Sequence, residues 1–104
     1  MKESVIEAKL RDQVKALGGR AYKWTSPGND GVPDRIVVLP GHPPVFVELK
    51  AEKGSLSRLQ EAQIRKLKEL GQDVRVLKGL PEVEAFLEEC RERVRGKKVM
   101  VDGI

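Results

Sequence analysis

The sequence is poor in cysteine, histidine and aromatic residues. Cys90 is the only cysteine among 104 residues, so no disulfide can form within the chain, and a reducing cytoplasm suits such a protein. The single histidine, His42, lies in a turn rich in proline and glycine, which argues against a histidine-based zinc site or catalytic triad. Aromatic residues make up 4% of the chain, so the core has to be mainly aliphatic.

The sequence also has no long apolar run. No stretch approaches the roughly 20 residues that a membrane-spanning helix requires. The amino-terminal segment leads into a charged helical pattern and does not resemble a signal peptide. Internal repeats and low-complexity tracts are absent as well. We therefore expect one cytoplasmic domain that does not interact with membranes.

Charge is what the chain has in abundance. Lys and Arg number 20 against 16 Asp and Glu, which gives a net charge of +4 and favours a polyanionic partner such as nucleic acid. The densest basic segment, residues 91–98, is either a solvated helix end or a strip that follows phosphates. Other basic residues that would extend such a strip are Lys9, Arg11, Arg20, Lys23, Arg58, Arg65 and Lys66.

Hydrophobic periodicity predicts seven elements in the order αβββαβα. Helices are expected over about residues 4–17, 56–70 and 82–93, and strands over residues 20–25, 35–39, 45–51 and 73–77. The last strand follows a helix, so a crossover should bring it into the sheet. We predict an α/β fold in which a mixed central β-sheet is flanked by helices, formed by residues 1–93. Residues 94–104 are predicted to be a basic carboxy-terminal tail or a late strand.

Two carboxylates and a lysine are predicted to meet at one edge of this sheet. Pro33 keeps the chain extended just before Asp34, at the mouth of one strand. Glu48 and Lys50 lie two positions apart on the next strand, so they point to the same face. A hairpin can bring Asp34 close to Glu48, where the two carboxylates repel unless a cation lies between them. The alternative is a half-exposed strand with a solvated Glu and Lys.

Glu7 and Gln60 are polar residues beside the apolar stripes of two predicted helices. Ser4 with Glu7, and Ser57 with Gln60, have the spacing of a capping box, in which the two side chains bond to each other's backbone N–H. A polar group on an apolar face also needs a partner, so each residue is equally a candidate for a polar site. From spacing alone both interpretations stay open.

The ordered set of motifs resembles the PD-(D/E)XK nuclease superfamily, and more narrowly the virus-type replication-repair nuclease domain, VRR-NUC. The resemblance rests on Glu7, on residues 31–35 (GVPDR), on residues 47–50 (VELK) and on residues 56–60 (LSRLQ). It spans residues 3–90, and the ordered set is far more specific than a bare PD…ExK match. The resemblance implies a restriction-endonuclease-like core and a stand-alone nuclease without an appended DNA-binding domain.

The resemblance also implies a role for each residue at the sheet edge. Asp34 and Glu48 would bind Mg²⁺ or Mn²⁺, with the backbone carbonyl of Leu49 as a further oxygen ligand. Lys50 would orient or activate the attacking water and stabilise the charge that develops on the phosphate. Hard oxygen ligands suit Mg²⁺, and a metal-bound water is more acidic than bulk water, so elementary chemistry agrees with these roles.

For the helical residues, the resemblance implies that Glu7 lies in the outer shell or serves a second metal. Gln60 would position Lys50 or the scissile phosphate. The implied activity is that of a metal-dependent DNA endonuclease, selective for branched DNA such as a Holliday junction, acting as a homodimer in a phage setting. Two alternatives stay open: a non-catalytic nucleic-acid-binding module on the same fold, and a small interaction protein whose Glu and Lys pairs are surface salt bridges.

Overall fold

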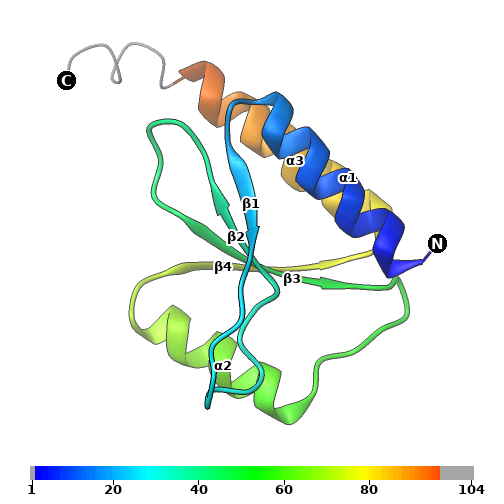
Figure 1. The fold of residues 1–104 in the computed structure, drawn as a ribbon, viewed down its shortest axis with the longest axis vertical. Coiled ribbons are helices and arrows are strands. Elements are labelled where there is room, and N and C mark those ends of the chain that lie inside the picture. Colours follow the sequence, from blue (N-terminus) through cyan, green and yellow to red (C-terminus); the bar gives the residue numbers. More distant parts are fainter. Residues whose placement is uncertain (1, 97–104) are drawn as a thin grey trace.

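A computed structural model describes residues 2–96, which form one four-stranded sheet with helices on both faces (Figure 1). The elements are α1 (Glu3–Ala16), β1 (Arg20–Lys23), β2 (Arg35–Val38), β3 (Val45–Lys50), α2 (Arg58–Glu69), β4 (Asp73–Lys78) and α3 (Gly79–Gly96). The predicted order αβββαβα and the predicted flanked sheet are therefore confirmed. No helix within residues 2–96 has the length and apolar character needed to cross a membrane.

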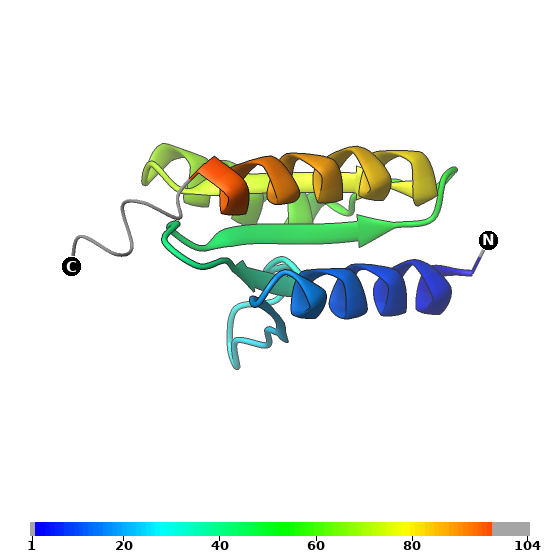
Figure 2. The ribbon, with the colours of Figure 1, turned by 90° about the horizontal axis from the view of Figure 1, so that it is seen from above.

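The sheet is mixed, as the sequence predicts. Its strand order is β1-β2-β3-β4, with antiparallel pairing between β1 and β2 and between β2 and β3. The β3 and β4 strands are parallel, because α2 carries the chain back to the end of the sheet where β3 began. Figure 2 shows α1 and α3 side by side on one face, with α2 on the far side of the sheet.

The β3 strand divides its six residues between two different environments. Val45, Val47 and Leu49 are buried in the apolar layer beneath α1 and α3, whereas Phe46, Glu48 and Lys50 face α2. This alternation follows from the pleat of a strand and confirms the predicted faces. The apolar layer also contains Ile6, Leu10, Val14, Val37, Leu39, Leu77, Val83, Phe86, Leu87 and Cys90. Burial raises the pKa of the Cys90 thiol to about 11, so this residue packs as a small apolar side chain.

The boundaries of all three helices differ from the sequence prediction by one to three residues. The α1 helix begins at Glu3 after Lys2, so Ser4 lies inside the first turn and the capping-box interpretation of Ser4 and Glu7 is wrong. The α3 helix begins earlier than expected, because Pro81 is tolerated in its first turn, where its missing N–H costs no hydrogen bond, and it also ends later than expected. Residues 94–96 continue this helix, and the remainder of the expected tail lies outside the described residues.

An ion-pair network joins β4 to α3 on the face opposite α2. Arg75 donates to Asp73 at 2.7 Å and makes two bonds to Glu89, at 2.7 and 2.9 Å. Its guanidinium also lies 5.7 Å from the centre of the Phe86 ring. The hydrogen bonds from Arg75 hold the pKa values of Asp73 and Glu89 below their usual range. The network therefore stabilises the fold only while these two carboxylates are ionised.

We expect Arg75→Met to lower the free energy of unfolding by about 1 kcal/mol at neutral pH, because all three side chains are partly exposed to solvent. Carboxylates with lowered pKa values stabilise the native state above their unfolded pKa of about 4, and this contribution is lost as the pH falls. The difference in melting temperature between wild type and variant should therefore shrink from pH 7 to pH 3. Arg91→Met, which breaks only a single-turn pair with Glu88, is the control. A difference that stays constant with pH would contradict the assignment.

Candidate active site

Asp34 and Glu48 come together where the pairing of β2 with β3 ends. Arg35 lies opposite Val47 in this antiparallel ladder, so the next step along each strand places Asp34 opposite Glu48. One carboxylate oxygen of Asp34, Oδ2, accepts a hydrogen bond of 3.1 Å from the backbone N–H of Leu49. The side chain of Asp34 therefore binds a backbone N–H of β3 just beyond the last residue pair of the β2–β3 ladder.

Glu48 is a buried carboxylate with one oxygen unused. Its side chain is 2% exposed, and its Oε2 atom accepts a 3.2 Å hydrogen bond from Nε2 of Gln60 and lies 3.6 Å from Nζ of Lys50. Its Oε1 atom is buried and has no hydrogen-bond partner within residues 2–96. Burial, reinforced by the negative charge of Asp34 and opposed by Lys50, raises the pKa of Glu48 to about 7. Among residues 2–96, Lys50 is the cation paired with Glu48, and it approaches Oε2 and not Oε1.

The atoms that could bind a metal ion beside Oε1 of Glu48 are all oxygens. In a strand, the N–H and C=O of one residue point to the same side, so the carbonyl of Leu49 opens towards Asp34 as its N–H does. Asp34, Glu48 and this carbonyl form a donor set of the kind that Mg²⁺ and Mn²⁺ prefer. Within residues 2–96, no cluster of three or more His, Cys, Asp or Glu side chains has a metal-binding arrangement. Water would therefore have to supply the remaining ligands of such an ion.

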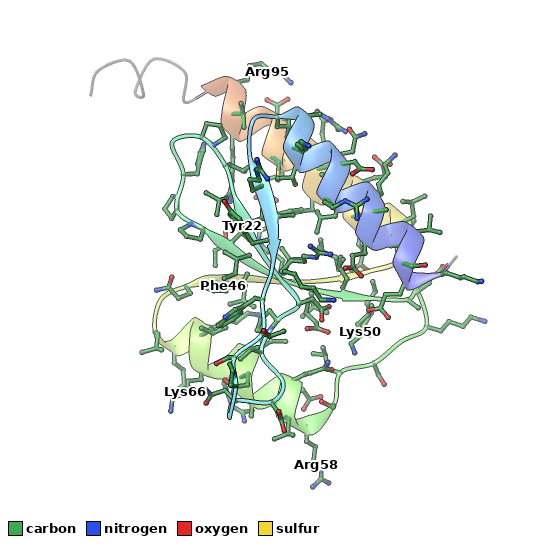
Figure 3. All side chains as sticks on the ribbon, viewed as in Figure 1. Tyr22, Phe46, Lys50, Arg58, Lys66 and Arg95 are labelled. Atoms are coloured by element: carbon green, nitrogen blue, oxygen red, sulfur yellow. The ribbon has the colours of Figure 1, made fainter. Side chains whose placement is uncertain are left out.

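Lys50 has a second lysine beside it. Lys50 and Lys78 are register partners at the carboxyl ends of the parallel strands β3 and β4, so their side chains leave the same face of the sheet. Figure 3 shows Lys50 on the side of β3 that faces α2. No ion pair of Lys78 occurs in the described part of the chain. Sequence reasoning missed Lys78, because only the parallel pairing of distant segments brings it to this edge.

Glu7 lies on the other face of the sheet, where it forms an ion pair with Arg35 of β2. Arg35 is 8% exposed, and its Nη1 atom also donates to the carbonyl oxygen of Ala21 at 3.0 Å. The structure therefore pairs Glu7 with this buried cation, and its role in an outer shell or at a second metal stays a prediction. The signal in the sequence was an arginine at a core-facing strand position, since a buried guanidinium requires an acidic partner.

Gln60 takes part in the capping box and also contacts the polar site, so both interpretations of its position hold. Its Oε1 atom accepts from the backbone N–H of Ser57 at 2.9 Å, and its own N–H donates to Oγ of Ser57 at 3.1 Å, which completes the capping box. At the same time its Nε2 atom donates to Glu48. Within residues 2–96, the side-chain hydrogen bonds of Gln60 thus connect the α2 cap to Glu48, and none of them involves Lys50.

Two aromatic side chains of the amino-terminal half, Trp24 and Tyr22, differ in their burial. Trp24 is half-buried, with its ring 5.3 Å from that of Phe46, whereas Tyr22 is 56% exposed (Figure 3).

In residues 91–96, Arg91, Arg93 and Arg95 pair with carboxylates of α3 and β4, which favours the solvated helix end over a phosphate strip. Lys9 and Arg11 pair with Glu84 and Asp12. The exposed basic residues with no ion pair inside residues 2–96 include Arg20, Lys23, Arg58, Arg65 and Lys66.

A mixed sheet with Pro-Asp before one strand and Glu-x-Lys on the next is the arrangement of the PD-(D/E)XK nuclease fold. The model of the VRR-NUC domain matches residues 3–81, and the chain belongs to this family. A protein named "Putative nuclease p44", from Acyrthosiphon pisum secondary endosymbiont phage 1, is 43% identical over 77 residues, which cover 74% of this chain and 83% of the relative.

Two solved structures share the fold. One, titled "VRR_NUC domain", superposes with a TM-score of 0.77 at 28% identity and covers 83% of this chain and 94% of its own. Another, titled "VRR_NUC domain protein", has a TM-score of 0.71 at 16% identity and covers 88% of this chain and 89% of its own. At that lower identity the likeness concerns the fold alone. Membership of the family supports a nuclease function.

Neutralising Glu7 and neutralising Asp34 should have different effects on the free energy of unfolding. Glu7→Gln leaves the buried guanidinium of Arg35 without its counter-charge, so we expect the free energy of unfolding to fall by about 2 kcal/mol. Asp34→Asn removes a charge that faces Glu48, so metal-free protein at pH 8 should be as stable as wild type or more stable. Chemical denaturation followed by circular dichroism measures both. A loss of stability in Asp34→Asn that equals the loss in Glu7→Gln would contradict this division.

Proposed function

We propose that this protein is a metal-dependent DNA endonuclease that hydrolyses phosphodiester bonds. The observation that carries the proposal is the buried, unpartnered Oε1 of Glu48, held beside Asp34 and Lys50. Burying a carboxylate next to another carboxylate destabilises the fold unless a cation compensates both charges. A domain gains nothing from this arrangement unless it binds a cation there.

Asp34, Glu48 and the backbone carbonyl of Leu49 would hold Mg²⁺ or Mn²⁺. When bound, such an ion makes a coordinated water more acidic and offsets the charge of a phosphate. Asp34 is already oriented, because the N–H of Leu49 holds its Oδ2 atom. Glu48 is oriented through Oε2, which leaves Oε1 as the ligand atom.

Lys50 would supply the proton-holding and charge-stabilising group of the reaction. Glu48 keeps the ammonium of Lys50 within 3.6 Å of its carboxylate, and the lysine side chain is only 19% exposed. A confined ammonium has a fixed direction, so it can orient the attacking water and stabilise the charge that develops on the phosphate. Glu7 would contribute from a distance, because its pair with Arg35 fixes the start of the strand that follows Asp34.

The alternative is a nucleic-acid-binding module that has kept the fold but does not cut. Its binding would need only the exposed basic residues, among them Arg58 and Lys66 on α2. Buried carboxylates repel phosphate, and a module that only binds DNA has no use for them. The intact set of Asp34, Glu48 and Lys50 therefore favours the enzyme.

The proposal extends to the substrate and the assembly. We propose a homodimer that acts on branched DNA such as a four-way junction, in the cytoplasm of a phage-infected host. The support is the family resemblance and a symmetry argument, since a two-fold dimer presents two matched sites to the symmetric strands of a junction. The phage relative is consistent with that setting.

Cleavage of a labelled four-way junction and of a matched linear duplex, with Mg²⁺, Mn²⁺ or EDTA, tests the activity. Wild type should cut the junction only when metal is present. Asp34→Asn and Lys50→Ala should each reduce the rate by at least about 100-fold without loss of fold or DNA binding. Lys15→Ala removes the same charge from the last turn of α1, which packs on the other face, and should cut like wild type.

The outcomes separate the parts of this proposal. Equal cutting of both substrates would keep the nuclease and remove the preference for junctions. Absence of cutting with either metal, together with salt-sensitive DNA binding, would replace the enzyme by the binding module.

Light scattering after gel filtration tests the assembly. The monomer mass is 11.6 kDa, so a homodimer should elute with twice that mass. A species of monomer mass under DNA-binding conditions would rule out paired cutting by a stable dimer.

A further inference from the structure

The amino-terminal cap of α2 is hydrogen-bonded to Glu48, one of the proposed catalytic carboxylates. Gln60 uses both ends of its side-chain amide, since Oε1 accepts from the N–H of Ser57 at 2.9 Å and Nε2 donates to Glu48 at 3.2 Å. The backbone N–H of Gln60 donates to Oγ of Ser57 at 3.1 Å. Two hydrogen bonds therefore close the cap of the helix, and a third connects it to a carboxylate at the carboxyl end of β3.

The direction of the Gln60 amide follows from the partner at the cap. A backbone N–H can only donate, so Ser57 engages the amide oxygen and turns the NH₂ group towards Glu48. With Oε2 of Glu48 held by Gln60 and approached by Lys50, only Oε1 is left without a protein partner. Reversal of the amide would set two oxygens against each other and would free Oε2 to rotate.

We infer that Ser57 is a positioning residue for the metal site, acting through Gln60 on Glu48. The inference rests on the proposed function, because it assigns Oε1 of Glu48 to the metal. A capping box ordinarily stabilises only the first turn of a helix. Here the same N–H that completes the box also determines which oxygen of a buried carboxylate is presented to the metal.

The loop that leads to Asp34 packs against this same turn. Gly31 has a φ of +92°, and a Cβ atom at this position would lie 2.6 Å from the carbonyl carbon and oxygen of Leu59 and 2.9 Å from the nitrogen of Gln60. Backbone therefore meets backbone between the loop and α2, which only glycine permits. The cap of α2 is thus fixed relative to both carboxylates, Asp34 through the loop and Glu48 through Gln60.

A comparison of Ser57→Pro with Ser57→Ala isolates the N–H of Ser57. Both variants lack Oγ, but only proline lacks the N–H, and the φ of −75° and ψ of 167° at this position suit proline. We expect Ser57→Pro to bind Mn²⁺ about 10-fold more weakly than Ser57→Ala and to lose kcat by a similar factor, in the range seen when a partner of a metal ligand is removed. The KM for DNA should differ little between the two variants.

Ala62→Gly is the control for helix stability, because it weakens α2 at an exposed position that does not contact the cap. It should lower the melting temperature about as much as Ser57→Ala does and leave Mn²⁺ affinity at the wild-type value. Equal Mn²⁺ affinities of Ser57→Pro and Ser57→Ala would overturn the inference. So would a loss in Ala62→Gly as large as the loss in Ser57→Pro.

A readout without metal keeps this test separate from the proposed function. In metal-free protein, the side-chain NH₂ resonances of Gln60 in ¹H–¹⁵N spectra should move clearly in Ser57→Pro and only slightly in Ala62→Gly. Unmoved resonances would overturn the inference. A clear shift in a protein that neither binds Mn²⁺ nor cuts DNA would leave the orientation of Gln60 standing while removing the metal site and the nuclease.

Discussion

The burial of Glu48 is the constraint on which the rest of the site depends. A carboxylate that is 2% exposed has lost nearly all of its hydration, and the protein returns only part of what water would supply. Gln60 and Lys50 both approach Oε2, whereas Asp34 adds a second negative charge. The arrangement therefore costs stability in the metal-free protein, and under the proposed function the unpartnered Oε1 is the atom that would bind a hard divalent cation.

The fold tolerates the cost of burying Glu48 because β3, the strand that carries it, also places apolar side chains in the core. The pleat sends Val47 and Leu49 into the apolar layer under α1 and α3, while Glu48 and Lys50 leave on the face of α2. Asp34 and Arg35 divide in the same way, since neighbours along an extended chain point to opposite faces. The pair of Arg35 with Glu7 therefore holds the backbone of Asp34 from the opposite face, without placing another charge beside Asp34 and Glu48.

Local periodicity explains how much of this the sequence could predict. The order of elements, the two faces of β3 and the meeting of Asp34 with Glu48 follow from repeats of 3.6 and 2 residues and from a short hairpin. The partner of Glu7 was not predicted, because Arg35 is far along the chain and spacing left a cap with Ser4 and a polar site equally open. The cap interpretation was wrong because the N-cap is Lys2, two residues before Ser4, and its side chain makes no capping hydrogen bond.

The remaining element, α3, shows how the fold separates support from chemistry. The family match ends at residue 81, and every proposed catalytic or metal-binding residue lies before that point. The α3 helix supplies Val83, Phe86 and Leu87 to the apolar layer, and Glu89 binds Arg75 of β4. What the site needs from this helix is a covered sheet and a fixed β4, which many apolar sequences can provide. By contrast, Gln60 on α2 must supply a donor, an acceptor and a helical position at once, so its side chain cannot be replaced without changing either the cap or the carboxylate.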